Sequence, residues 1–137
     1  MSMNKDINKK VKDIAPQYNL ELALLFGSQV TGKTHSESDF DVAYMSNEKL
    51  SFNDEIKLNT DLTEIFRNDR VSLVNLKTAS PLLIKQIVRN CLILYEKERH
   101  LFSDLLAYAL RTYEEAGPLF ELRRHYVEYK IDQYKHA

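Results

Sequence analysis

Apolar residues recur along the chain at two different spacings, and these spacings predict its helices and strands. Three stretches repeat apolar residues every three to four positions, as the buried side of a helix does. They are residues 7–14, 52–66 and 81–88. Pro16 follows the first stretch, while Ser80 and Pro81 supply a cap and a first position for the third. We therefore expect three short helices before residue 90.

Four shorter runs are mostly apolar and rich in β-branched or aromatic residues, which is typical of strands. They are residues 20–26, 39–46, 70–76 and 92–96. Helices and strands follow one another up to residue 97, and this order predicts an α/β (α+β) core. From residue 98 the pattern is helical, with one break at Gly117 and Pro118. We expect a single domain in two parts, a core over residues 1–97 and a helical C-terminal arm over residues 98–137.

The C-terminal arm carries more apolar residues than one buried helix face requires. Two neighbouring rows recur at helical spacing in its first half. They are Leu101, Leu105, Tyr108 and Thr112, and Phe102, Leu106, Ala109 and Tyr113. One row is enough to pack the helix on the core. Because aromatic residues in the arm's second half are interleaved with arginines, we expect the remaining surface to bind a partner protein.

The charge balance and the single cysteine indicate which partners and which cellular compartment to expect. The chain holds 19 Lys and Arg against 20 Asp and Glu, so no overall field attracts it to nucleic acid or to an anionic membrane. Cys91 lies in an apolar run and is interpreted as a buried core thiol. No run is apolar and long enough to span a membrane, and no signal peptide is recognisable. We expect a cytoplasmic protein whose main partner is neither membrane nor nucleic acid.

Residues 27–34, GSQVTGKT, match the pattern of a phosphate-binding P-loop. Such a loop must open a long helix, and a later strand must end in an aspartate that holds magnesium. Here Thr34 is followed within five residues by the strand predicted over 39–46. Val30 and Thr31 are also β-branched, and such residues resist the positive φ angles that these loops need. A P-loop NTPase is therefore a lesser alternative.

The same stretch supports a second interpretation, a nucleotide site built around a carboxylate-bound metal. Gly27 lets the backbone approach phosphates closely, and Ser28 adds a hydroxyl at the start of a short helix. Asp39 and Asp41 lie two apart on a strand, so both carboxylates project from one face. Two neighbouring negative charges favour a cation between them, and Mg²⁺ prefers oxygen ligands of this kind.

Gly27 and Ser28, ten further residues and an Asp-x-Asp pair form the stretch GSQVTGKTHSESDFDV. This arrangement resembles the signature of the nucleotidyltransferase superfamily that includes DNA polymerase beta. The later segment, RVSLVNLKTASPLLIKQIVRNCLILYE, looks like the corresponding segment of the MNT proteins, the minimal branch of this superfamily. The resemblance covers residues 20–96 and implies the nucleotidyltransferase fold, a small mixed sheet of about four strands flanked by helices.

The resemblance also implies roles for particular residues. Gly27 and Ser28 would hold the triphosphate of ATP, and Lys33 is the nearest cation that could meet a phosphate. Asp39 and Asp41 would be the catalytic carboxylates and the ligands of two Mg²⁺ ions. One ion would orient the triphosphate, and the other would activate the attacking hydroxyl.

MNT proteins serve as antitoxins of HEPN-domain ribonuclease toxins, and the best-understood members transfer AMP from ATP to a tyrosine of the toxin. The resemblance therefore implies a protein adenylyltransferase that forms a hetero-oligomer with such a toxin. Transfer to a small molecule, such as an aminoglycoside, is a further alternative. It is less favoured because the chain has no separate substrate domain.

One position departs from the family's pattern. The family carries a third carboxylate on the strand predicted over 70–76, where this chain reads VSLV and has Ser72. Asp69 lies three residues away and would point to the opposite face of the strand. Serine cannot act as a general base near neutral pH, and losing such a base commonly costs ~10²–10⁴-fold in rate. Two hypotheses follow: an enzyme of reduced activity, or a non-catalytic antitoxin that binds its toxin through the C-terminal helices.

Overall fold

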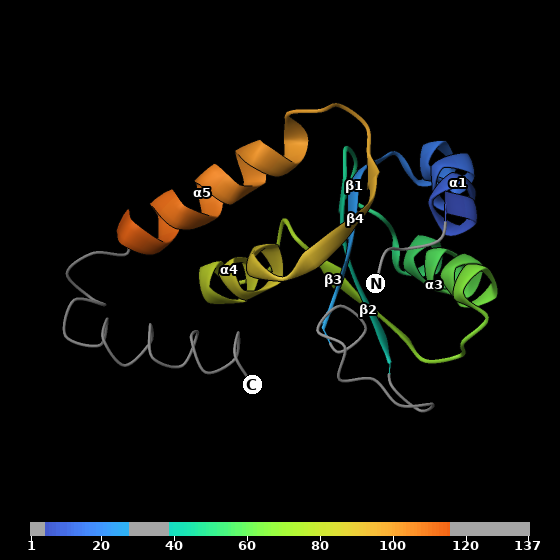
Figure 1. Ribbon diagram of the computed structural model, residues 1–137. Helices are drawn as coiled ribbons and strands as arrows, with labels where there is room; N and C mark the ends of the chain where they lie inside the picture. Colours follow the sequence, from blue (N-terminus) through green and yellow to red (C-terminus); the bar gives the residue numbers. More distant parts are fainter. Residues whose placement is uncertain (1–4, 28–38, 116–137) are drawn as a thin grey trace.

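The computed structural model describes residues 5–27 and 39–115, which form a four-stranded sheet covered by helices on both faces (Figure 1). In chain order the elements are α1 (Lys5–Ile14), the 3-10 helix η1 (Ala15–Tyr18), β1 (Leu20–Phe26), β2 (Phe40–Ser46), α3 (Phe52–Phe66), β3 (Val71–Asn75), α4 (Pro81–Arg89), β4 (Cys91–Glu96) and α5 (Leu101–Glu115). The strands and helices predicted between residues 7–27 and 39–97 all appear, with their ends displaced by no more than about two residues.

The sheet is mixed, with the strand order β3-β2-β1-β4. The central strand β1 runs antiparallel to both β2 and β4, and β2 runs parallel to β3. The prediction of a small mixed sheet flanked by helices is therefore confirmed. In the part of the chain that the structure describes, no helix is long and apolar enough to cross a membrane.

Alternate residues of β2 point into two separate apolar clusters, one on each face of the sheet. Val42 and Tyr44 belong to the cluster that α1, η1 and α3 cover. Ala43 belongs to the cluster that α4 and α5 cover, and Met45 packs against it. This alternation follows from the two-residue period of a strand. It places Asp41 on the same face as Ala43 and Met45, the face of α4 and α5.

Helix α3 is fastened to the rest of the fold by two tyrosine hydroxyls. The Tyr44 hydroxyl of β2 donates to the Glu55 carboxylate at 2.5 Å, and the Tyr18 hydroxyl of η1 donates to the Asp61 carboxylate at 2.5 Å. Burial, followed by the hydrogen bond to the neighbouring carboxylate, raises the pKa of both phenols well above the usual value. Both tyrosines therefore stay neutral donors throughout the physiological range.

The residues predicted to begin helix α4 do so. Ser80 has an extended backbone, and its hydroxyl accepts a hydrogen bond from the Leu83 N–H at 3.2 Å, with Pro81 in the first helical position. Ser51 caps α3 in the same way by accepting from the Asp54 N–H at 3.1 Å. Each hydroxyl satisfies one of the N–H groups that a helix start leaves without a partner.

Helix α5, the described part of the C-terminal arm, packs on α4 and on β1. Leu105 and Ala109 are buried against the sheet face, while Leu106, Tyr108 and Leu110 are 36%, 46% and 47% exposed. The helix thus has an exposed apolar surface beyond its packed row, as the sequence indicated. The arm beyond residue 115 lies outside the described residues, and the division of the chain at residue 97 stays a prediction.

Tyr44→Phe should lower the free energy of unfolding by about 1.5–3 kcal/mol, because it removes a hydrogen bond to a carboxylate from a side chain that is almost fully buried. Urea unfolding measures this change. The matched control is Tyr95→Phe. Tyr95 is half-buried against the same cluster but has no hydrogen-bond partner among the described residues, so its loss should cost under about 0.5 kcal/mol. Equal losses in the two variants would show that the Glu55 bond does not fasten α3.

Candidate active site

Three of the predicted site residues meet at one edge of the sheet, where β1 ends and β2 and β3 begin. Phe26, the last residue of β1, pairs with Asp41 of β2. Asp41 in turn pairs with Ser72 of β3 in the parallel register. Neighbouring strands lie about 4.8 Å apart. Asp41 on β2 therefore lies between Gly27, which follows β1, and Ser72 on β3.

Gly27 is fixed as glycine by both its backbone and its neighbour. Its φ angle is +85°, in the region that side chains disfavour. A Cβ atom built on it would also collide with Oδ2 of Asp41. The turn after β1 therefore brings its backbone directly against the Asp41 carboxylate. A cation or ligand that this carboxylate holds therefore lies beside the Gly27 backbone.

Asp41 carries a charge that its surroundings disfavour. Burial, and next the negative charge of Asp39, raise the pKa of this carboxyl above its ordinary value. Asp39 itself is exposed and lies just before β2. A cation bound by both carboxylates would remove this repulsion and replace the water that Asp41 lacks. The pair therefore fits a hard divalent ion such as Mg²⁺.

Ser72 stands where a third carboxylate would complete such a site. It lies opposite Asp41, and its neighbours Val71 and Leu73 pack into the cluster on the other face of the sheet. Asp69 precedes β3 and is exposed, outside the register that brings Ser72 to Asp41. Among residues 5–27 and 39–115, no group of three His, Cys, Asp or Glu side chains is arranged to hold a metal. Within these ranges the site offers two carboxylates and one neutral hydroxyl.

The remaining predicted site residues, Ser28 and Lys33, lie outside the described residues, so their roles as phosphate ligands stay predictions. The same holds for the metal and catalytic roles of Asp39 and Asp41. The sequence did not indicate that the Gly27 backbone meets the Asp41 side chain. Fourteen positions separate these two residues along the chain, and their contact depends on the pairing of β1 with β2.

The P-loop interpretation of residues 27–34 does not fit the fold. A P-loop joins a strand to a helix that crosses over to a parallel strand. Here β1 and the next strand, β2, are antiparallel neighbours. The strand that follows Thr34 begins at Phe40, which leaves no room for a long helix between them.

Cys91 behaves as a structural thiol. It is half-buried, pairs with Phe26 across β1 and β4, and its Sγ lies 3.9 Å from the Val88 carbonyl oxygen. Burial raises the pKa of its thiol to about 11. The thiolate needed for a nucleophile is therefore scarce at neutral pH.

The family model described as "Polymerase beta, Nucleotidyltransferase" matches residues 9–100 of the chain. A comparison with curated proteins gives no significant match. A comparison with solved structures gives several matches. Their sequence identities to this chain are below 25%, so they are evidence for the fold alone.

A chain of a toxin–antitoxin crystal structure with AMP-PNP superposes with a TM-score of 0.70 and 24% identity, covering 88% of this chain and 95% of the other. A chain of the structure described as tri-AMPylated Shewanella oneidensis HEPN toxin in complex with MNT antitoxin superposes with a TM-score of 0.66 and 23% identity. The match covers 92% of this chain and 97% of the other. A chain of the MntA–HepT toxin–antitoxin crystal structure superposes with a TM-score of 0.66 and 21% identity, covering 91% of this chain and 97% of the other.

Gly27→Ala should destabilise the protein by at least about 1 kcal/mol through its positive φ alone, with an added cost from the collision with Asp41. Thermal unfolding of the single variants and of Gly27→Ala/Asp41→Ala separates the two causes. The double variant should lose less than the sum of the single variants, because the carboxylate that blocks the Cβ is gone. Strict additivity would mean that the close approach carries no energy.

Asp41 should destabilise the metal-free fold at neutral pH. Its pKa is raised above 3.8 in the folded chain, so the folded state binds the proton more tightly than the unfolded state does. Stability is therefore lost as the pH rises from about 3.8 through the raised pKa. In EDTA near pH 7, Asp41→Asn should have a higher Tm than the wild type, and the difference should shrink near pH 4.

Two controls accompany this measurement. Asp69→Asn removes an exposed carboxylate next to β3 and should give no comparable gain in Tm. Millimolar Mg²⁺ should raise the Tm of the wild type and leave that of Asp41→Asn nearly unchanged. A lower Tm for Asp41→Asn in EDTA at neutral pH would contradict the destabilising role of the charge.

Proposed function

The chain belongs to the polymerase beta nucleotidyltransferase family, and on that premise we propose that it transfers AMP from ATP to a tyrosine hydroxyl of a cognate HEPN-domain toxin. The transfer would neutralise the toxin, so that the protein acts as an antitoxin. The observation that carries the proposal is the meeting of Gly27, Asp41 and Ser72 at one edge of the sheet, with Asp39 beside them.

The nature of the nucleotide and of the acceptor is supported by the structural neighbours. One of them is a toxin–antitoxin complex with AMP-PNP, an ATP analogue. Another contains a tri-AMPylated HEPN toxin bound to an MNT antitoxin. Both share this chain's fold over at least 88% of its length. A protein acceptor also suits a small chain whose α5 has an exposed apolar surface.

The reaction is a displacement at the α-phosphorus of ATP. The tyrosine oxygen forms a bond to that phosphorus, the bond from the phosphorus to the oxygen bridging to the β-phosphate breaks, and pyrophosphate leaves with the bonding electrons. The phenolic proton goes to solvent water, because the residue beside Asp41 is Ser72 and not a carboxylate. The backbone at Gly27 and the Ser28 hydroxyl would hold the triphosphate, and Asp39 and Asp41 would hold Mg²⁺. When bound, Mg²⁺ supplies positive charge that stabilises the phosphate oxygens and the departing pyrophosphate.

Ser72 limits the rate at which the acceptor proton can be removed. A serine hydroxyl beside Asp41 cannot take a proton near neutral pH, whereas a carboxylate there could. A phenol, with a pKa of about 10, loses its proton more readily than an aliphatic hydroxyl does. A tyrosine acceptor is therefore the hydroxyl that tolerates this site best.

Ser72 also favours a second candidate function, an antitoxin that neutralises its toxin by binding through the C-terminal helices without chemistry. In this case the nucleotide site would bind ATP through the Asp39 and Asp41 pair but transfer little. The exposed apolar residues of α5 support binding in both cases. Transfer of label separates the two functions.

Ser72→Asp should raise the rate of label transfer from α-labelled ATP to the cognate HEPN toxin, by ~10²–10⁴-fold, because it restores a general base. Asp41→Asn should abolish transfer, and Asp69→Asn, a carboxylate change outside the site, should leave the rate unchanged. Label from the wild type would establish the enzyme. Label from Ser72→Asp alone would favour the binding antitoxin, and no label from any variant would refute the transferase.

A further inference from the structure

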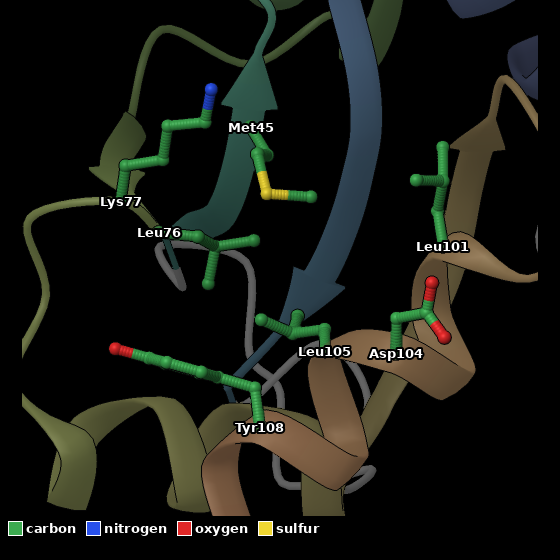
Figure 2. A pocket seen from close by; sticks show the side chains of 7 residues that line it. All are labelled: Met45, Leu76, Lys77, Leu101, Asp104, Leu105 and Tyr108. Carbon is green, nitrogen blue, oxygen red and sulfur yellow. The ribbon is translucent and has the colours of Figure 1, made fainter. Parts of the chain in front are cut away.

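A pocket of about 320 Å³ lies between α5 and the ends of β2 and β3, at the edge of the sheet opposite to Asp41 (Figure 2). The ionisable groups at its rim have partners: Lys77 lies 3.9 Å from the Glu21 carboxylate, and Asp104 lies 2.7 Å from Nδ1 of His100. Paired charges of both signs do not select one kind of ligand. The lining residues are Met45, Leu76, Lys77, Leu101, Asp104, Leu105 and Tyr108. A charge that can act on the reaction lies at the other edge of the sheet, where β3 begins.

Arg70 lies directly before β3, on the face of the sheet that carries the candidate active site. The Phe40 N–H donates to the Arg70 carbonyl oxygen at 2.8 Å, so the Arg70 backbone is part of the parallel ladder between β2 and β3. Val71, the next residue, packs into the cluster on the face of α1 and α3. Because side chains alternate along a strand, the exposed side chain of Arg70 points to the other face, which Asp41 and Ser72 share.

The strand register also sets Arg70 beside the first of the two predicted metal ligands. Asp41 pairs with Ser72, and the same register continued back by two residues brings Asp39 next to Arg70. Neighbouring strands lie about 4.8 Å apart, and residues two apart on one strand are separated by roughly 6.6 Å. The long side chain of Arg70 can therefore reach the space over Ser72 as well as the Asp39 carboxylate.

Strand order gives the two sides of the site different tasks in the proposed reaction. β1, which ends directly before Gly27, and β3 lie on opposite sides of β2. In a displacement at phosphorus, the attacking and leaving oxygens are roughly in line, on opposite sides of the phosphorus. Pyrophosphate that leaves on the side of Gly27 implies an acceptor oxygen that arrives over β3, where Arg70 and Ser72 lie.

Other charged groups near this edge belong to other sides of the site. Arg67 ends α3, which covers the opposite face of the sheet. Arg89 ends α4 and lies two residues before Cys91, which pairs with β1, so it is on the side of the leaving group. Asp69 is exposed and outside the register. In the part of the chain that the structure describes, Arg70 is thus the cation that the strand register places on the acceptor side.

We propose that Arg70 is a catalytic residue that contacts the acceptor oxygen and stabilises its negative charge during transfer. The proposal rests on the proposed function, since this oxygen belongs to the tyrosine that attacks ATP. Arg70 already has an interaction partner. A guanidinium has five N–H donors, so it can bind a second oxygen without losing the first.

The role of Arg70 follows from the serine beside it. Ser72 cannot take the phenolic proton, so the O–H bond breaks with its proton going to water, and the oxygen keeps the electron pair. That pair forms the bond to the α-phosphorus as the bond to the β-bridging oxygen breaks. Arg70 neither takes nor gives a proton, because a guanidinium stays charged. An opposite charge within about 4–6 Å favours the anionic form of a group, which is the form that attacks.

Steady-state label transfer to the HEPN toxin tests this contact. Arg70→Gln should lower kcat by about 10-fold, the effect of one pKa unit on the amount of phenolate, and should leave the KM for ATP nearly unchanged. Arg70→Lys keeps the charge and should recover most of the loss. The matched control, Arg67→Gln, removes an exposed arginine from the other face and should not change kcat. A raised KM for ATP with an unchanged kcat would make Arg70 a nucleotide ligand and overturn the proposal.

Arg70 and Ser72 should also be coupled. In Ser72→Asp a carboxylate removes the proton during the attack, so the reaction depends less on a phenolate formed beforehand. In that background Arg70→Gln should cost less than about threefold, a smaller loss than in the wild type. Equal losses in the two backgrounds would contradict the stabilisation of the phenolate by Arg70.

A second readout needs no transfer. The toxin is labelled with fluorotyrosine and bound to the protein in the presence of Mg²⁺ and an ATP analogue with carbon between the α- and β-phosphorus, which cannot release pyrophosphate. Fluorine NMR is recorded below the ordinary phenol pKa of about 10. One tyrosine signal of the bound toxin should move toward the position of the deprotonated phenol with the wild type and with Arg67→Gln. With Arg70→Gln it should stay.

The two readouts separate this proposal from the proposed function. Label transfer that Arg70→Gln leaves unchanged would overturn the role of Arg70 and leave the transferase intact. A tyrosine signal that moves only when Arg70 is present, while no variant transfers label, would support the contact and refute the transferase. The absence of a moving signal with the wild type would overturn the role of Arg70, and label transfer alone would then decide on the transferase. Unchanged circular dichroism and Tm confirm that each variant is folded.

Discussion

The pairing of β1 with β2 is the constraint on which the site depends. Its register sets Phe26 opposite Asp41, and only that register lets the turn at Gly27 lie against the Asp41 carboxylate. The adjoining parallel pairing then brings Ser72 to the other side of Asp41. Because side chains alternate along a strand, a shift of one residue would turn Asp41 into the apolar cluster on the opposite face. The chemistry therefore depends on backbone hydrogen bonds formed well away from the carboxylates.

The sheet keeps this register because both of its faces are covered. On one side the cluster includes α1 and α3, and two tyrosine hydroxyls fasten the latter. On the other side α4 and α5 complete the second cluster. Tyr44 links the core to the site, since it lies on the same strand as Asp41 and its hydroxyl binds the Glu55 carboxylate of α3. Packing energy on one face thus stabilises the strand whose other face carries a charge that is costly to keep.

Much of the fold could be predicted from the sequence because its signals are local. The apolar run at residues 20–26 and the Ser80–Pro81 start of α4 appear where the sequence indicated. The two-residue spacing of Asp39 and Asp41 likewise suggested a shared face. The contact of Gly27 with Asp41 and the place of Ser72 beside Asp41 could not be derived from local patterns, since both follow from strand pairing. Ser72 was assigned to the site only through the family resemblance.

The pocket under α5 was not foreseen for a related reason. Its walls come from strand ends and a helix that are more than twenty residues apart in the chain. The rows of apolar residues in the arm indicated excess surface but not which side chains it would leave exposed. Tyr108 belongs to one of the predicted rows and Leu110 to neither, yet the two are almost equally exposed, and only the tyrosine lines the pocket.

Strand β2 carries the demands of the site, the core and the pocket in seven residues, Phe40–Ser46. Its even-numbered members Phe40, Val42 and Tyr44 pack in the core on one face, whereas on the other face Asp41 lies in the site and Ala43 and Met45 pack in the second core cluster. Single substitutions can alter one of these tasks at a time. A one-residue insertion or deletion would exchange all of them together. Among relatives, this segment should therefore accept substitutions but keep its length, while insertions and deletions should occur in the loop that follows it.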